Sequence, residues 1–130
     1  EMFEAMEISG TTALNCANVM LYFVVWNQPD LVDIYFDPRC GPRRIRRPIT
    51  GVVGEAFRTL TTRVSNTTQE DPAFDPDVDW IDHWPKTLSM MAVPCLDAGE
   101  VVCVCAFVNS LALAGFRSPG DVDTAGELMR

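Results

Sequence analysis

Runs of apolar residues, each ended by turn-forming residues, divide this chain into short elements. Residues 19–26 are apolar at every position, and an Asn-Gln-Pro-Asp turn separates them from the apolar-rich residues 31–36. A strand that is apolar on both sides must be covered on both faces, so we expect residues 19–26 in the middle of a sheet. Residues 87–96 and 101–108 are two further apolar segments, and the Asp-Ala-Gly-Glu connection between them predicts a hairpin.

Helical spacing of apolar residues marks three other segments. Residues 3–17 place apolar side chains on one face of a helix, and so do residues 51–60, which follow the N-cap candidate Thr50. A Ser-Pro-Gly-Asp sequence opens a closing helix that runs to residue 129. The remaining segments are short strands at residues 45–49 and 61–65, an acidic surface loop at residues 66–76 and a short helix at residues 77–84.

This order of elements predicts an α/β (α+β) fold, in which a central antiparallel sheet of about six strands carries helices on both faces. A chain of 130 residues fits one domain, residues 1–130. Because the chain stops inside a predicted helix, we expect this domain to be excised from a longer protein.

Charge and cysteine usage narrow the possible partners. The chain has 18 acidic and 10 basic residues, a formal net charge of −8. A nucleic-acid binder needs a basic surface that displaces counterions, so we expect no nucleic-acid partner. No run reaches the roughly 20 apolar residues of a membrane-spanning helix. The five cysteines are odd in number and three lie in apolar segments, which indicates a reducing, cytoplasmic setting.

Motifs for catalysis or metal binding are weak. Residues 75–79 alternate acids as a calcium loop does, but the loop's glycine and final glutamate are missing. Cys103 and Cys105 share a strand face, yet the single histidine, His83, completes no zinc ligand set. The sequence contains neither a Ser-His-Asp arrangement nor a phosphate-binding P-loop. We therefore expect no catalytic residues, no bound metal and no cofactor.

Three segments together resemble the GAF domain, a small sensory fold. Residues 51–59, Gly-Val-Val-Gly-Glu-Ala-Phe-Arg-Thr, are similar to the family's glycine-containing helix start, which follows a strand that ends in proline, here Pro48. Residues 64–74 are similar to the family's strand and acidic turn with an Asp-Pro-x-Phe element. Residues 92–109 are similar to its last hairpin. The resemblance covers residues 13–129, almost the whole chain.

Within this family, the chain most resembles the cyclic-nucleotide-binding GAF domains of phosphodiesterases. In those domains a phenylalanine at the end of the second strand stacks on the purine and the next aspartate binds its edge, which implies these roles for Phe36 and Asp37. The helix that starts at Gly51 would offer free amide groups to the cyclic phosphate. The resemblance therefore assigns ligand binding to Phe36, Asp37, Val52, Val53, Asp79, His83 and Thr87.

The function that this resemblance implies is regulatory: a small-molecule-sensing module that binds a purine cyclic nucleotide (cAMP or cGMP) and controls a linked effector domain. The alternative is a degenerate GAF domain that acts as a dimerisation or scaffold module without ligand. Ser110, which replaces the family's lysine, and the bulk of Val53 favour that alternative, and the terminal helices would then join two copies as a homodimer. The family also contains methionine-sulfoxide reductases, whose catalytic cysteine would fall at Val52 or Val53, so we expect that this chain is not an enzyme.

Overall fold

The computed structural model describes residue 14 and residues 16–35, 44–80, 86–111, 115–117 and 120–128. The strands in these ranges are β1 (Cys16–Val25), β2 (Gln28–Tyr35), β3 (Arg44–Pro48), β4 (Arg63–Ser65), β5 (Met90–Asp97) and β6 (Glu100–Ser110). The helices in these ranges are α2 (Gly51–Thr59), α3 (Gly120–Leu128) and a single 3₁₀ turn, η2 (Thr68–Glu70). Within the same ranges, no helix is long and apolar enough to cross a membrane.

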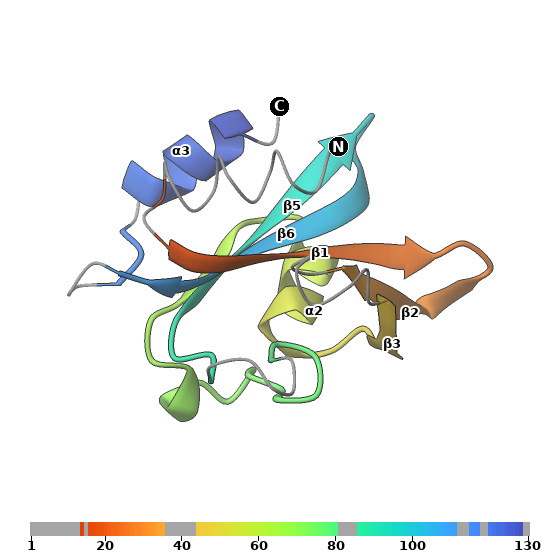
Figure 1. Ribbon diagram of the computed structural model, residues 1–130. Helices are drawn as coiled ribbons and strands as arrows, with labels where there is room; N and C mark the ends of the chain where they lie inside the picture. The colour runs from red at the N-terminus through yellow and green to blue at the C-terminus, as the bar shows by residue number, and fades with distance from the viewer. Residues whose placement is uncertain are drawn as a thin grey trace.

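The strands form one antiparallel sheet in the order β3-β2-β1-β6-β5-β4. The two longest strands, β1 and β6, pair in the centre of this sheet, as their apolar sequences predict. Helix α2 packs on one face of the sheet and α3 on the other (Figure 1). The predicted fold class, an antiparallel sheet of six strands with helices on both faces, is confirmed.

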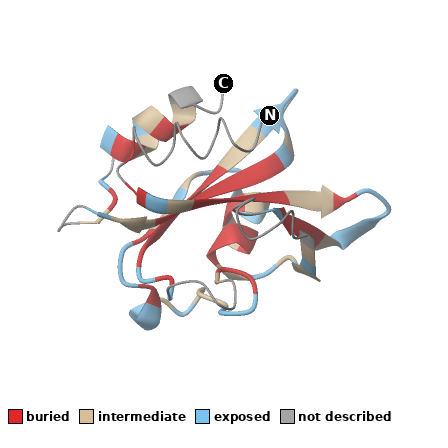
Figure 2. Cartoon of the chain, viewed as in Figure 1, coloured by how far each residue is buried: buried red, intermediate tan, exposed pale blue. Residues whose placement is uncertain are grey.

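Alternation of side chains along the central strands divides the interior into two apolar cores. Met20 and Tyr22 of β1 pack with Val52 and Val53 of α2, whereas Leu21 packs in the core that α3 covers. Buried residues accordingly follow the central strands and the inner sides of both helices in Figure 2. The sheet is thus a shared partition between two cores, and the two helices contribute to different ones.

Two predicted helices differ from the structure. The helix expected over residues 3–17 does not include its last two residues, because β1 begins at Cys16. Residue 14 forms a bend, and residues 3–13 and 15 lie outside the described residues. The short helix expected over residues 77–84 is absent from its described part, residues 77–80, which form turns. The physical reason is that Asp79 directs its carboxylate at the start of α2 and at the amide of Asp75.

Strand β5 begins at Met90, later than the predicted Thr87, because a side chain of β6 binds the preceding segment. Asn109 adopts a left-handed backbone with a φ of 59°. Its Oδ1 accepts a hydrogen bond from the amide of Leu88 at 2.7 Å, and its Nδ2 donates to the carbonyl of Lys86 at 3.1 Å. The side chain therefore satisfies backbone groups that a longer strand would have paired.

A buried tyrosine links the centre of the sheet to the loop beneath it. Tyr22 is fully buried, and its hydroxyl donates a hydrogen bond of 2.7 Å to the carbonyl of Val78. Burial, followed by the nearby carboxylate of Asp79, raises the pKa of Tyr22 well above its usual value, so the hydroxyl remains a donor at any physiological pH. This hydrogen bond positions Val78, the residue that precedes Asp79.

We predict that Tyr22→Phe lowers the free energy of unfolding by about 1–2 kcal/mol, because it leaves the buried carbonyl of Val78 without its donor. Urea denaturation measures the change. Tyr35→Phe is the matched control, since Tyr35 lies at the surface with 37% of its area exposed and should change stability by less than about 0.5 kcal/mol. Equal effects of the two substitutions would contradict the role of the buried bond.

Candidate functional site

Helix α2 begins with a glycine whose position no other residue could take unstrained. Gly51 has a φ of 79°, in the left-handed region. A Cβ atom built on Gly51 would collide with the carboxylate of Asp79. The preceding Thr50 does not cap the helix; its hydroxyl instead donates a hydrogen bond of 2.6 Å to Asp75 Oδ2. The start of α2 is therefore shaped to receive a carboxylate from another segment.

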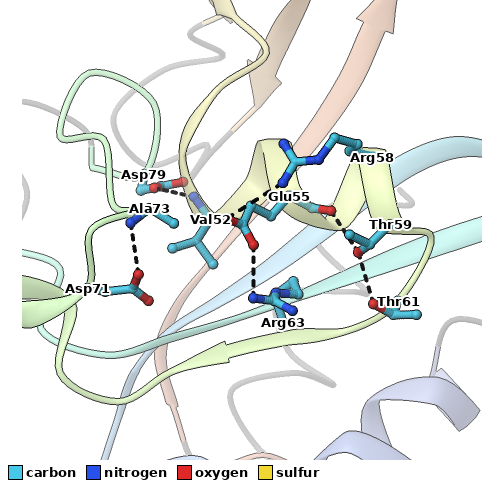
Figure 3. Close-up of polar contacts among 9 residues, drawn as sticks. All are labelled: Val52, Glu55, Arg58, Thr59, Thr61, Arg63, Asp71, Ala73 and Asp79. Atoms are coloured by element: carbon cyan, nitrogen blue, oxygen red, sulfur yellow. Dashed lines mark hydrogen bonds and ion pairs between the residues drawn. The ribbon is translucent and has the colours of Figure 1, made fainter.

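That carboxylate belongs to Asp79, which is fully buried. Asp79 Oδ2 accepts from the amide of Val52 at 2.8 Å, and Oδ1 accepts from the amide of Val53 at 3.2 Å. The amide of Asp75 donates a third bond of 3.0 Å to Oδ2. Figure 3 shows Asp79 facing the first turn of α2. Helix starts attract anions because their amides are unpaired and the helix dipole is positive there, and here the protein's own carboxylate takes that place.

The environment of Asp79 opposes its charge. Burial raises the pKa of Asp79 from 3.8 to about 6. The three hydrogen bonds from backbone amides lower the pKa, and the neighbouring carboxylate of Asp75 raises it further. Desolvation therefore outweighs the hydrogen bonds, and Asp79 takes up a proton at a pH much closer to neutral than an exposed aspartate does.

The backbone around Asp79 is held by a chain of threonines. Thr87 donates a hydrogen bond of 2.9 Å from its hydroxyl to the carbonyl of Asp79. Thr68 of η2 in turn donates one of 2.7 Å to the carbonyl of Thr87. Both threonines are buried, so neither bond competes with solvent. The acidic loop and the segment before β5 are thereby joined at the start of α2.

Helix α2 is also tied to the edge of the sheet. Glu55 pairs with Arg63 of β4 at 2.8 Å and, more loosely, with Arg58 at 3.7 Å (Figure 3). Arg63 is half-exposed, so solvent screens the ion pair and it contributes at most about 1 kcal/mol.

Beside Asp79, the acidic loop together with Trp80 and Lys86 lines an open hollow of about 490 Å³. Its lining combines two aromatic side chains, one carboxylate, one ammonium group, two uncharged polar side chains and a proline: Thr68, Gln69, Asp71, Phe74, Pro76, Trp80 and Lys86. Asp71 is turned into the loop, where its Oδ1 accepts from the amide of Ala73 at 2.9 Å (Figure 3). A hollow of this size and composition can hold a small organic molecule with a planar ring.

The structure brings together four of the seven residues that the resemblance assigned to the ligand. Val52, Val53 and Thr87 all hydrogen-bond to Asp79. The expectation of free amides at the start of α2 is corrected, because Asp79 occupies them. Phe36, Asp37 and His83 lie outside the described residues. Ligand contact by these seven residues stays a prediction.

Of the seven residues that the resemblance assigned to the ligand, none of the four that the structure describes lines the hollow. Phe74 is part of the family motif in residues 64–74, and Trp80 directly follows the assigned Asp79. The aromatic residues of an otherwise acidic, proline-containing loop were the available indication. Among the described residues, no group of three or more metal-binding side chains lies together.

Comparisons with known proteins show the fold. No protein-family model and no curated protein matches this sequence. The GAF domain of an Acinetobacter phosphoenolpyruvate-protein phosphotransferase is similar in structure with a TM-score of 0.74, at 12% identity over 98% of this chain and 74% of that one. At this level of identity the likeness shows architecture alone. The chain therefore has the fold of GAF domains.

Enzymes are also among the structures with this fold. The free methionine-R-sulfoxide reductase of Neisseria meningitidis has a TM-score of 0.70, at 22% identity over 99% of this chain and 74% of that one. The type II enzyme of Thermoplasma acidophilum has a TM-score of 0.65, at 13% identity over 100% of this chain and 91% of that one. These neighbours contradict the expectation that the chain is not an enzyme. That expectation depended on missing catalytic motifs and on the valines, Val52 and Val53, at the positions of the family's catalytic cysteine, whereas proteins that share this fold include enzymes.

We predict that the stability of the protein falls as Asp79 ionises. Its pKa in the folded state, about 6, lies above the ordinary 3.8, so the folded protein binds this proton more tightly than the unfolded chain does. The contribution is fully present below about pH 4 and is lost as the pH rises through about 6, a change of up to about 3 kcal/mol.

Asp79→Asn removes this titration. Urea denaturation of both proteins between pH 4 and pH 7 should therefore show the native protein losing stability relative to the variant over that window. Other acids titrate in both proteins and cancel in the difference. A difference that does not change with pH would contradict the assignment.

We also predict that Gly51→Ala lowers the free energy of unfolding by about 2 kcal/mol or more, through the positive φ and the collision with Asp79. Gly126→Ala in α3 is the control, because a Cβ there meets no atom within 4 Å. It should be neutral or stabilising by up to about 1 kcal/mol. Thermal and urea denaturation compare the two.

Proposed function

We propose that this chain is a regulatory, ligand-sensing domain and that its ligand is a purine cyclic nucleotide, cAMP or cGMP, bound in the hollow of the acidic loop. The observation that carries the proposal is the composition of that hollow next to Asp79: two aromatic side chains, a carboxylate and an ammonium group around about 490 Å³. Pockets for small molecules typically measure roughly 300–1,000 Å³.

The chemistry of the lining matches the parts of such a nucleotide. Phe74 and Trp80 offer aromatic faces on which a purine can stack. Lys86 is exposed and can pair with the cyclic phosphate, while Asp71 can accept a hydrogen bond from a base amino group. Phe36, Asp37 and His83 remain the further contacts that the sequence resemblance implies.

A ligand in the hollow would act on the rest of the domain through Asp79. Trp80 is the next residue along the chain, so ordering Trp80 against a base restrains the loop that holds the start of α2. A ligand that binds one arrangement of this loop better than another shifts the equilibrium between them. In a longer cytoplasmic signalling protein that shift would control the linked effector domain.

Calorimetric titration with cAMP and cGMP tests the proposal, with Lys86→Gln as the variant. Losing the ammonium group should weaken binding roughly tenfold, as expected for one hydrogen bond to a charged group. Arg58→Gln is the matched control, since it removes an exposed cation on α2 that does not line the hollow. Adenosine and guanosine, which lack the phosphate, should bind both variants equally.

Other experimental outcomes would support a different function. No heat and no thermal shift with millimolar nucleotide would overturn the proposal, and a dimer in light scattering would then support the dimerisation or scaffold module. Thiol-dependent reduction of free methionine sulfoxide by the same preparation would place the chain with the reductases that share its fold.

A further inference from the structure

Two cysteines face each other across the β5–β6 hairpin. Cys95 of β5 and Cys103 of β6 are direct partners in the antiparallel ladder. Directly opposed residues in such a ladder have Cα atoms about 4.5 or 5.5 Å apart, depending on the type of pair. Both separations fall within the range of roughly 4.4–6.8 Å that a disulfide requires. Opposed side chains also project from the same face of the sheet, so no strand movement is needed to bring the two sulfur atoms together.

The ladder is irregular at this point, which gives the pair room to adjust. The register shifts between Cys95 and Leu96, so that Leu96 pairs with Val101 and leaves Val102 as the extra residue. Bulges of this kind locally disrupt strand pairing and change its twist. Disulfide formation demands a specific dihedral angle, and the change of twist beside the pair alters the angle at which the two side chains meet.

The two thiols differ in their access to solvent. Cys95 is half-buried, whereas Cys103 is 6% exposed. Burial, followed by the neighbouring Cys95, raises the pKa of Cys103 to about 12, so this thiol is protonated at neutral pH. The more exposed Cys95 is therefore the thiol that an external oxidant reaches first, and Cys103 is the second.

The other described cysteines are placed differently. Cys105 is fully buried and lies opposite Val93, and Cys16 is buried and lies opposite Ser110. In the described ladders, only Cys95 and Cys103 stand as a directly opposed pair of cysteines. Proximity of two thiols with unequal access is the arrangement in which one sulfur reacts and the other resolves.

We propose that Cys95 and Cys103 form a thiol–disulfide exchange site that low-molecular-weight disulfides of the glutathione class oxidise to a cross-strand disulfide. The Cys95 thiol loses its proton and attacks one sulfur of the disulfide, whose S–S bond breaks; one small thiol leaves with the proton. The Cys103 thiol then loses its proton and attacks the Cys95 sulfur, and the second small thiol leaves. Two cysteines are oxidised by two electrons and one small disulfide is reduced to two thiols.

This site is independent of the proposed ligand hollow. Cys103 projects from the same face of the sheet as Cys105, which packs in the core that α3 covers. The hollow is built from the acidic loop, and the core packed against that loop includes α2. The test for nucleotide binding and the test for thiol oxidation can therefore give independent results.

Incubation of the reduced protein with oxidised glutathione, followed by thiol counting in denaturant and peptide mass spectrometry, tests the proposal. In a Cys40→Ser background, which removes the cysteine outside the described residues, the count should fall by two from four, and one cross-linked peptide should join Cys95 to Cys103. Dithiothreitol should restore both thiols. An unchanged count, or a cross-link between another pair, would overturn the proposal.

Single substitutions separate the two roles. Cys103→Ser should stop the reaction at a glutathione adduct on Cys95, because the resolving thiol is gone. Cys95→Ser should leave Cys103 reduced, since that thiol is buried. Cys16→Ser is the matched control and should still lose two thiols. Loss of two thiols in Cys95→Ser would contradict the assignment.

Discussion

The contact between the carboxylate of Asp79 and the first amides of α2 organises the helix side of this protein. A helix start leaves amides that need an acceptor, and the local candidate, Thr50, is directed at Asp75 instead. Asp79 supplies that acceptor from the turns that follow the acidic loop, and Gly51 leaves the space for it. Because the carboxylate is buried, its charge is costly, and the hydrogen bonds from the backbone amides offset only part of that cost. The group that joins helix α2 to the loop is therefore a carboxylate whose pKa, about 6, lies close to neutral pH.

The sequence was sufficient to predict the sheet, because its central strands leave little choice. A segment such as residues 19–26, apolar on both sides, has to lie between two covered faces. The helix start at Gly51 and the candidate status of Asp79 could also be recognised. The bond between Asp79 and Val52 could not, because it joins residues 27 positions apart through a loop without periodicity. The same holds for Trp80 and Lys86, whose shared hollow exists only once that loop has folded back.

The two faces of the sheet carry different chemistry. On the α2 side, polar and aromatic groups of the acidic loop surround a space suited to a small molecule. The α3 side is apolar and contains buried thiols. Both reductases and the GAF domain of a phosphotransferase share this architecture, so the fold alone does not define a function.

The sheet's role as a partition between two cores limits how the chain can change length. Along β1, Met20 and Leu21 belong to opposite cores. Deleting or inserting a single residue there would exchange the two sets of side chains and place each against the wrong helix. Trp26, at the β1–β2 turn, is 94% exposed, and extra residues at that end would disturb neither core. Tolerance of insertions should therefore differ sharply between neighbouring positions of one hairpin.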